Sequence, residues 1–305
     1  MRNHRAFTLT EMLVVLAILS VTTLVAIQAT DSLVEQSRHE TTRQTLDHIR
    51  GAIVGDPTSR HSDGTPRVTG FVTDTGRLPM IPAPLDELLL QPATLIPHAV
   101  QTFDSDRDGS DDVSLSSGWN GPYLRLGAGS LEIVDGWGRT PVVTTGPPFV
   151  VSSLGADGNS DSPEEGFDAD IGISIDVADY SANVVFRLFQ VDANSSSRLD
   201  PAPTGNQRLG VLFYAPNAAG GTDGAIQEQL LVVPYNGHSV TGQPINLEHT
   251  RSETLTGQVA ARAILWSDAN SNDQLDSGES ITQKSYVHHL TIVPGANRRV
   301  EMELR

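Results

Sequence analysis

Two short acidic loops hold the side chains best suited to binding a metal ion. The first spans residues 104–112, where acids alternate around Gly109. Positions 1, 3, 5 and 9 of an EF-hand-like loop are filled by Asp104, Asp106, Asp108 and Asp112. Position 12, which normally supplies a bidentate acid, is Leu115. The spacing predicts a Ca²⁺ site, and the alternative is a solvated turn of the same composition.

The second acidic loop, residues 268–279, is more complete. Positions 1, 3, 5, 9 and 12 are filled by Asp268, Asn270, Asn272, Asp276 and Glu279. Position 6 is Asp273 instead of glycine, so the turn requires this aspartate to adopt the left-handed backbone conformation. Calcium is the predicted cofactor here too, with a solvated turn as the alternative.

The sequence contains no recognisable catalytic constellation. The chain has no cysteine, which excludes thiol catalysis, disulfides and cysteine-ligated metals. Its histidines form no HExxH motif, and His288 and His289 would point to opposite faces of a predicted strand. No G-x-S-x-G elbow and no phosphate-binding glycine loop is present. We therefore expect no enzymatic activity, and an enzyme on a membrane anchor is the least favoured hypothesis.

Composition limits the partners. The formal net charge is -17, which argues against a nucleic-acid-binding surface because phosphate contacts need a basic face. Acids and bases are balanced in residues 1–50, so residues 51–305 carry the excess. With 305 residues, of which 38% are hydrophobic, the chain can form one or two domains with real cores.

The first residues have the pattern of an exported membrane anchor. Residues 1–6 are basic, and residues 7–27 form an apolar run interrupted by Glu11 and a few hydroxyl side chains. As a helix this run would be about 31 Å long, roughly the thickness of a bilayer core. Arg2 and Arg5 place the start of the chain on the cytoplasmic side, so the remainder would be exported.

The helix is predicted to continue to about Val54. Apolar side chains recur at helical spacing in its last turns, at Leu46, Ile49 and Ile53. This spacing predicts one face packed against a globular head. Gly55 and Pro57 then end the pattern.

The segment RAFTLTEML, residues 5–13, resembles the class III signal of type IV pilins and pseudopilins. The resemblance implies that a prepilin peptidase cuts between Ala6 and Phe7 and methylates the new amine of Phe7. It also implies that Glu11 neutralises the amine of a neighbouring copy during filament assembly. This agrees with the physics, because an ion pair in lipid costs less than a lone carboxylate. Ala6 stands where the family usually has glycine.

A second resemblance covers residues 76–172. The motifs, in chain order, are GRLP (76–79), LDELLLQP (85–92), WNGPYL (119–124), DGWG (135–138), GADG (155–158) and ADIG (169–172). This order is similar to the major, G-type pseudopilin of type II secretion. The usual DPWG is DGWG here, which suggests a more flexible turn.

In that family the loop between GADG and ADIG binds calcium. The resemblance implies Asp157 and Asp170 as ligands. The weaker candidates between them are Asp161, Glu164, Glu165 and Asp168. The absence of cysteine fits the G-type, since major type IV pilins usually close this region with a disulfide. The alternative is a plain acidic loop.

Residues 174–305 lie outside the resemblance and alternate as β structure. Their strands are predicted at 184–191, 209–214, 229–233, 258–266, 286–293 and 300–304. In the head, we predict strands at 123–126, 131–134, 141–144 and 149–152, and a short helical stretch at 85–90. An internal echo aligns Asp192 with Asp268, although Pro203 occupies position 12 of the first copy. The pattern favours one or two β-sandwich modules of the immunoglobulin or transthyretin type.

These observations predict an α+β fold: a pilin-like long helix packed on a small antiparallel sheet, followed by an all-β sandwich-like region. The expected segments are a leader (1–6), an assembly helix (7–54), a head (55–173) and a β extension (174–305). The expected function is a structural subunit of a type II secretion pseudopilus, or of a related type IV pilus-like filament, that supports protein export.

The expected partners are copies of the chain, other pseudopilins, the prepilin peptidase and the inner membrane. The precursor would cross the inner membrane once and place its globular part in the periplasm, and the filament would be periplasmic or at the cell surface. The alternative is a minor pilin or adhesin whose β domain binds a surface, a sugar or a cargo protein.

Overall fold

The structure is a computed structural model. It describes residues 9–56, 58–80, 83–127, 130, 132–146, 148–160, 166–191, 198–199, 203–216, 224–233 and 248–305. The chain forms two compact units, each assembled from separate segments. The first contains Met1–Asp47, Leu131–Thr144 and Val151–Ile173, and the second contains His48–Ser130, Thr145–Val150 and Ser174–Arg305. Residues 55–130, expected in the head, thus share a unit with the expected β extension.

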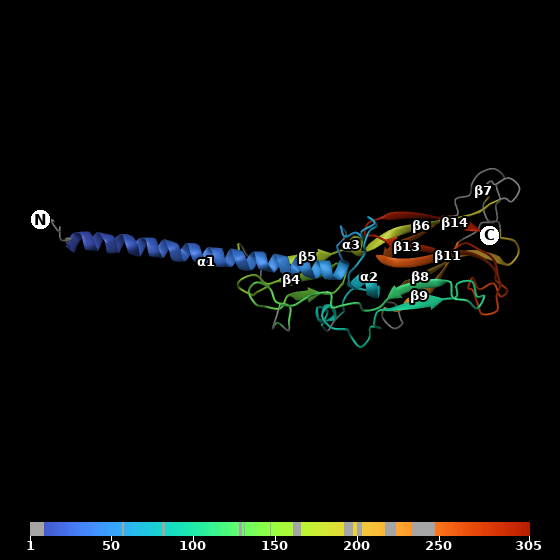
Figure 1. The fold of residues 1–305 in the computed structure, drawn as a ribbon, viewed down its shortest axis with the longest axis horizontal. Helices are drawn as coiled ribbons and strands as arrows, with labels where there is room; N and C mark the ends of the chain where they lie inside the picture. Colours follow the sequence, from blue (N-terminus) through green and yellow to red (C-terminus); the bar gives the residue numbers. More distant parts are fainter. Residues whose placement is uncertain are drawn as a thin grey trace. The chain divides into compact units, whose positions relative to one another are not determined.

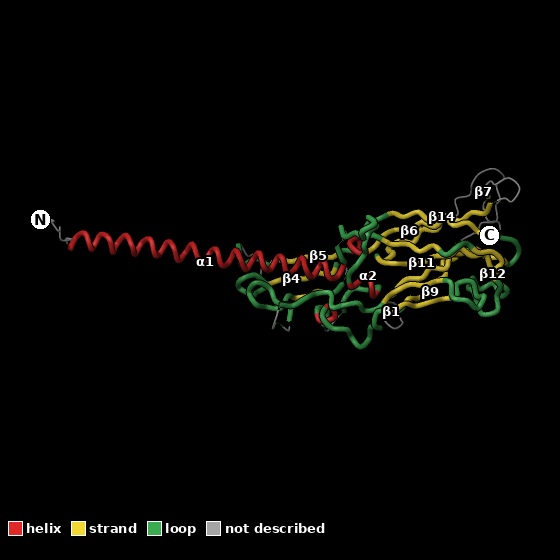
Figure 2. The backbone as a smooth tube through the Cα atoms, in the orientation of Figure 1, coloured by secondary structure: helices red, strands yellow, loops and turns green. Residues whose placement is uncertain are grey.

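One helix, α1, runs without interruption from Leu9 to Val54 (Figures 1 and 2). It ends at Gly55, whose φ of 80° is accessible to glycine and whose N–H donates to the carbonyl of Gly51 at 2.8 Å. A Cβ at Gly55 would lie 1.7 Å from the carbonyl oxygen of Thr69, so no larger residue fits there. The predicted helix end at Val54 is confirmed.

The predicted apolar face of α1 is also confirmed. Leu46, Ile49 and Ile53 are buried, with at most 1% of each residue exposed. Their spacing places them on one side of the helix, and their burial supplies the tertiary packing that a long helix needs for stability.

In the first unit, the DGWG turn packs directly on α1. The backbone N–H of Gly136 donates to Thr42 Oγ1 at 2.9 Å, and a Cβ at Gly136 would lie 2.0 Å from the carbonyl oxygen of Arg38. Glycine is therefore required by the close approach to the helix. The expected flexibility of the DGWG turn stays a prediction.

A small sheet joins strands β3 (Val142–Thr144), β4 (Phe149–Ser153) and β5 (Ile171–Ile175) in that order. The predictions at 141–144 and 149–152 are confirmed. The strand predicted at 123–126 is wrong, because the N–H groups of Tyr123 and Leu124 donate to the carbonyl of Leu88 instead of a partner strand. Residues 132–134 are not a strand either, and Leu131 lies outside the described residues.

The second unit contains a β-sandwich (Figure 1). One sheet has the order β10-β6-β14, with β7 pairing β6. The bounds are Ser181–Val191 (β6), Arg198–Leu199 (β7), Glu248–Leu255 (β10) and Asn297–Leu304 (β14). Strand β14 pairs with β6 in parallel, and β10 pairs with it antiparallel.

The other sheet has the order β12-β11-β8-β9, with β13 also pairing β11. The bounds are Gln207–Pro216 (β8), Ile226–Val232 (β9), Gly257–Ser267 (β11), Ile281–Lys284 (β12) and His288–Ile292 (β13). One core joins the two sheets through side chains such as Phe186, Phe213 and Met302. All six strands predicted in this region are confirmed as single strands of one sandwich.

A hairpin from the predicted head covers the other face of the second sheet. Strands β1 (Ala99–Phe103) and β2 (Val113–Ser117) form it, and the sequence analysis missed both. Val113 and Leu115 of β2 share a second core with residues of β8 and β11, including Tyr214 and Trp266. The central strands are therefore buried on both faces, which explains their nearly continuous apolar sequence.

Three short helical segments complete the described elements. They are α2 (Phe71–Thr75), the 3₁₀ turn η1 (Asp86–Leu88) and α3 (Val177–Tyr180). The helical stretch predicted at 85–90 is thus only a single 3₁₀ turn. The sequence analysis did not predict helix α2.

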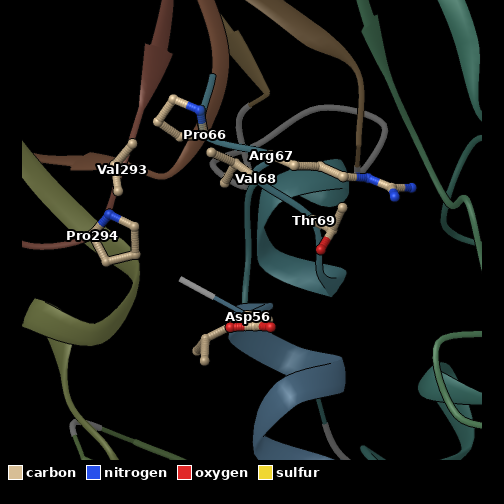
Figure 3. Close-up of a pocket in the computed structure, with 8 residues that line it drawn as sticks. Asp56, Pro66, Arg67, Val68, Thr69, Val293 and Pro294 are labelled. Atoms are coloured by element: carbon tan, nitrogen blue, oxygen red, sulfur yellow. The ribbon is translucent and has the colours of Figure 1, made fainter. Parts of the chain in front are cut away.

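The second unit also has a small hollow (Figure 3). It is lined by the end of α1, by residues 66–69 and by the turn at Val293 and Pro294. Its cavity volume of about 10 Å³ has room for about one water molecule, which is too little for an organic ligand.

Candidate functional site

The predicted assembly residue lies at the start of α1. Glu11 is in the first helical turn described and is exposed. Ala6 and Phe7, the predicted processing residues, lie outside the described residues.

The N-terminal part of α1 exposes apolar side chains all round. The exposed fractions are 78% for Leu9, 58% for Leu16 and 59% for Leu24. Others exposed in this part are Met12, Leu13, Val14, Val15, Ile18, Leu19 and Val21. A helix that is apolar on every side needs lipid or other protein around it.

Within the described part of the chain, no helix is both long enough and apolar enough to cross a membrane.

The first acidic loop forms the tip of the β1–β2 hairpin. Asp104, Asp106 and Asp108 offer carboxylate oxygens that lie within 4.8 Å of one another. The N–H groups of Asp108 and Gly109 donate to the carboxylate of Asp104 at 3.1 and 2.7 Å. Arg107 and Gly109 have φ of 62° and 92°, which turns the chain tightly enough to bring the acids together.

Two cations from the second sheet contact this loop, and the sequence analysis missed both. The Arg262 guanidinium donates to Ser105 Oγ at 2.5 Å and pairs with Asp106 at 3.0 Å and with Asp112. The Lys284 ammonium pairs with Asp106. Burial alone would raise the pKa of Asp106, but the Lys284 hydrogen bond and both positive charges hold that pKa below its usual value.

The second acidic loop connects β11 to β12. Asp268 is fully buried, and its carboxylate accepts from the N–H groups of Asn272 and Asp273, each at 3.1 Å. Ser271 and Asp273 both have φ of 58°. The left-handed conformation predicted for Asp273 is therefore confirmed.

The two loops share one hydrogen-bond pattern. In each, the carboxylate at position 1 accepts from the backbone N–H groups at positions 5 and 6. The side-chain oxygen at position 3 accepts from the backbone N–H at position 5. In each, the side-chain oxygen at position 5 also accepts from the backbone N–H at position 7. Both loops therefore have the backbone of DxDxDG-type loops, although position 6 differs in residue type.

The closing acid of the first loop is not at position 12. The N–H of Ala269, at position 2, donates to Glu279 Oε1 at 2.8 Å. The equivalent N–H, of Ser105, donates to Asp112 Oδ1 at 2.9 Å. Asp112 thus accepts from the N–H at position 2 as Glu279 does in the second loop, and Leu115 leaves position 12 of the first loop without a carboxylate.

The remaining ligands predicted in the second loop converge on Asp276. The amides of Asn270 and Asn272 donate to Asp276 Oδ2 at 2.8 and 2.7 Å, and the N–H of Asp276 donates to Glu279 Oε2 at 3.1 Å. Arg208 pairs with Asp273 at 2.5 Å and more distantly with Asp268 at 3.4 Å. All five predicted side chains therefore lie in one hydrogen-bonded loop.

The third predicted site, between GADG and ADIG, is only partly described. Asp157 accepts from the N–H of Asn159 at 2.9 Å, and Arg139 donates to the carbonyls of Gly155 and Ala156 at 2.5 and 2.9 Å. The residues in this region that lie outside the described ones include Asp161, Glu164 and Glu165. Within the described residues, three Asp, Glu or His ligand atoms gather only in the first loop, so Asp157, Asp168 and Asp170 remain predictions.

Comparison with known proteins adds one finding. The family model for the prokaryotic N-terminal methylation motif matches residues 1–27. The chain begins with a prokaryotic N-terminal methylation motif. No curated protein and no solved structure matches the chain.

The methylation motif includes the three residues predicted for processing and assembly, Ala6, Phe7 and Glu11. Its residues 9–27 lie in α1, the helix with the exposed apolar surface. The motif and the α+β architecture support a type IV pilin-like protein with a prepilin-type N-terminal anchor.

Proposed function

We propose that the protein is a structural, non-catalytic subunit of a type IV pilus-like filament. The observation that carries this proposal is the methylation motif at residues 1–27, continuous with a helix that exposes apolar side chains all round. Such a helix can be stored in a membrane before assembly and buried among other copies in a filament, since both environments cover its surface.

Glu11 gives the assembly a specific electrostatic contact. In the proposed mechanism, its carboxylate pairs with the methylated amine of Phe7 in another copy. A carboxylate without a partner would be costly in an apolar environment, so this pair favours one register between neighbouring helices.

Within this family we favour a pseudopilin of type II secretion, with the globular part in the periplasm. Three motifs of the G-type resemblance meet in the second unit. Arg77 of GRLP forms a two-point ion pair with Glu87 of LDELLLQP at 2.7 and 3.1 Å. Trp119 of WNGPYL donates to the carbonyl of Glu87 at 2.9 Å. Their contact supports a common structural role for these motifs.

The test combines processing and assembly. When prepilin peptidase is present, the intact mass and the N-terminal sequence of the purified protein should show that it begins at methylated Phe7. When the peptidase is absent, they should show that it begins at Met1. Glu11→Gln should be cleaved and methylated normally but should fail to form filaments, and Asp31→Asn in the same helix should assemble. Retention of residues 1–6 in the presence of the peptidase, or normal assembly of Glu11→Gln, would contradict the proposal.

A further inference from the structure

We infer that the first acidic loop is neutralised by the protein's own cations. Arg262 and Lys284 fasten the tip of the β1–β2 hairpin to the sandwich, so this loop serves as an internal clasp. The inference concerns the second unit alone and does not depend on the proposed function.

Arg262 is the central residue of the clasp. It lies on β11, and only 7% of it is exposed. Its Nε donates to the carbonyl of Ser285 at 2.9 Å, which fixes the guanidinium plane. Its Nη1 contacts Ser105 Oγ and the carboxylates of Asp106 and Asp112. A buried guanidinium without these anions would be strongly unfavourable, so the arginine and the loop require each other.

Lys284 adds the second positive charge. It is the single lysine of the chain and lies at the end of β12. Its ammonium pairs with Asp106, whose side chain is only 5% exposed, and approaches Asp108 at 3.9 Å. Asp106 is therefore contacted by two protein cations. A metal ion bound in this loop would need a carboxylate oxygen of Asp106 as a ligand, and these cations compete for it.

Apolar contacts complete the attachment of the hairpin. Phe103, at the end of β1, packs on Tyr214 with a ring-centroid distance of 5.2 Å. Val113 and Leu115 are buried in the core shared with β8 and β11. The hairpin is thus held along its length by packing and at its tip by ion pairs.

Among the residues that the structure describes, the second loop has no equivalent of this clasp. Its arginine, Arg208, has a 31% exposed side chain and pairs most closely with Asp273, which is outside the predicted ligand set. The two loops therefore share a backbone pattern but differ in their charged partners: protein cations pair with the acids of the first loop much more closely than with the predicted ligands of the second.

Hydrogen exchange of the full-length protein tests the clasp. Exchange of peptides from residues 99–117 is measured with EDTA and with Ca²⁺ for the wild type, Glu279→Gln, Lys284→Met and Asp106→Asn. In Glu279→Gln, which removes the closing carboxylate of the second loop, we expect the hairpin to be equally protected in both buffers. Lys284→Met and Asp106→Asn should both exchange roughly tenfold faster in the hairpin, because the first leaves Asp106 with one of its two cations and the second leaves Arg262 with one of its two carboxylates.

Lys284→Arg is the conservative control and should keep the protection, whereas Arg125→Met removes a positive charge elsewhere and should change nothing in the hairpin. The inference is overturned if the hairpin of Glu279→Gln is protected by Ca²⁺ and exposed by EDTA. It is also overturned if Lys284→Met exchanges like the wild type.

Discussion

Asp74 is a half-buried acid at the end of α2 that holds the WNGPYL segment in place. Tyr123 donates its hydroxyl to Asp74 Oδ2 at 3.0 Å and accepts from the N–H of Asn120 at 3.0 Å. Burial raises the pKa of Asp74, and the hydrogen bond from Tyr123 offsets only part of this increase. Burial and the charge of Asp74 also raise the pKa of Tyr123, so the phenol remains a donor at neutral pH.

The raised pKa of Asp74 predicts a pH-dependent cost. A carboxyl group whose pKa is higher in the folded state stabilises the fold when protonated, and this stabilisation is lost as the pH rises from about 3.8 through the folded pKa. Asp74→Asn keeps an acceptor for Tyr123 and cannot ionise. Its free energy of unfolding, compared with the wild type, should therefore improve as the pH rises through this window, by about 1.4 kcal/mol for each unit by which the two pKa values differ. Urea unfolding from pH 3.5 to 7 measures it.

Asp63→Asn is the matched control with the opposite sign. The Thr65 hydroxyl lowers the pKa of exposed Asp63, so this variant should lose relative stability only as the pH rises towards about 3.8, and its difference from the wild type should stay flat from there to pH 7. An Asp74→Asn variant whose stability difference stays flat over the same range would contradict the assignment.

Individual side chains differ in how far the sequence predicts their role. The acids of both loops are recognisable because alternate spacing is a local pattern. The left-handed conformation of Asp273 is predictable because this residue stands at the position that such loops usually give to glycine. Arg262 gives no such signal within the apolar sequence of β11. Its partners, Ser105 and Asp112, lie 157 and 150 residues away, so only the folded chain brings them together.

The loop between β11 and β12 is attached to the core of the sandwich. Trp266 is fully buried and donates from its indole to the carbonyl of Gln274 at 3.2 Å, and Asp268 is also fully buried. Order in this loop is therefore coupled to packing of the second sheet. We propose it as the calcium site, because oxygen-bearing side chains fill its positions 1, 3, 5, 9 and 12, and its arginine pairs most closely with Asp273, outside that set.

Calcium should stabilise the protein through this loop. At a concentration about 100 times Kd, the ion would add about 2.7 kcal/mol. That corresponds to a rise in melting temperature of roughly 5–10 °C for a unit of this size. Glu279→Gln should lose most of the rise, because it removes the closing carboxylate, and Glu132→Gln should keep it. Mg²⁺ should not replace Ca²⁺, since it demands octahedral geometry. Equal wild-type melting in EDTA and in Ca²⁺ would exclude the site.

Elements were predictable where their pattern is local. The periodicity of Leu46, Ile49 and Ile53 and the glycine at 55 define the end of α1, and apolar runs define the strands of the sandwich. Strands β1 and β2 were missed because their sequences, AVQTF and VSLSS, are short and mixed in polarity. Their strand character depends on burial against β8 and β11, which the sequence alone does not reveal.

Across the whole molecule, the two compact units are interleaved along the sequence. The sandwich is therefore not an independent appendage beginning at residue 174. Its second sheet is buried on one side by β6 and β14 and on the other by the β1–β2 hairpin. Gly76, before the hairpin, also contacts the sandwich, since a Cβ there would lie 2.5 Å from the carbonyl oxygen of Pro216. Every copy of the protein should carry the β region as an integral part of this unit.

A substitution in the hairpin should consequently destabilise strands 150 residues away. Leu115 is 3% exposed in the core shared with β8 and β11. Leu115→Ala should lower the free energy of unfolding by about 2–5 kcal/mol through lost burial and the cavity left behind. Because the hairpin shares a core with β8 and β11, we expect the second unit to unfold cooperatively, and hydrogen exchange in the most protected amides of β11 should accelerate by the corresponding factor.

Ser114→Ala is the matched control, because Ser114 is exposed on the opposite face of β2 and should change little. If residues 174–305 instead formed a separate module, Leu115→Ala would accelerate exchange in the hairpin and leave β11 protected. Exchange measured in both peptides of one sample distinguishes these outcomes, since a cooperative unit responds in both and an appendage responds only in the hairpin.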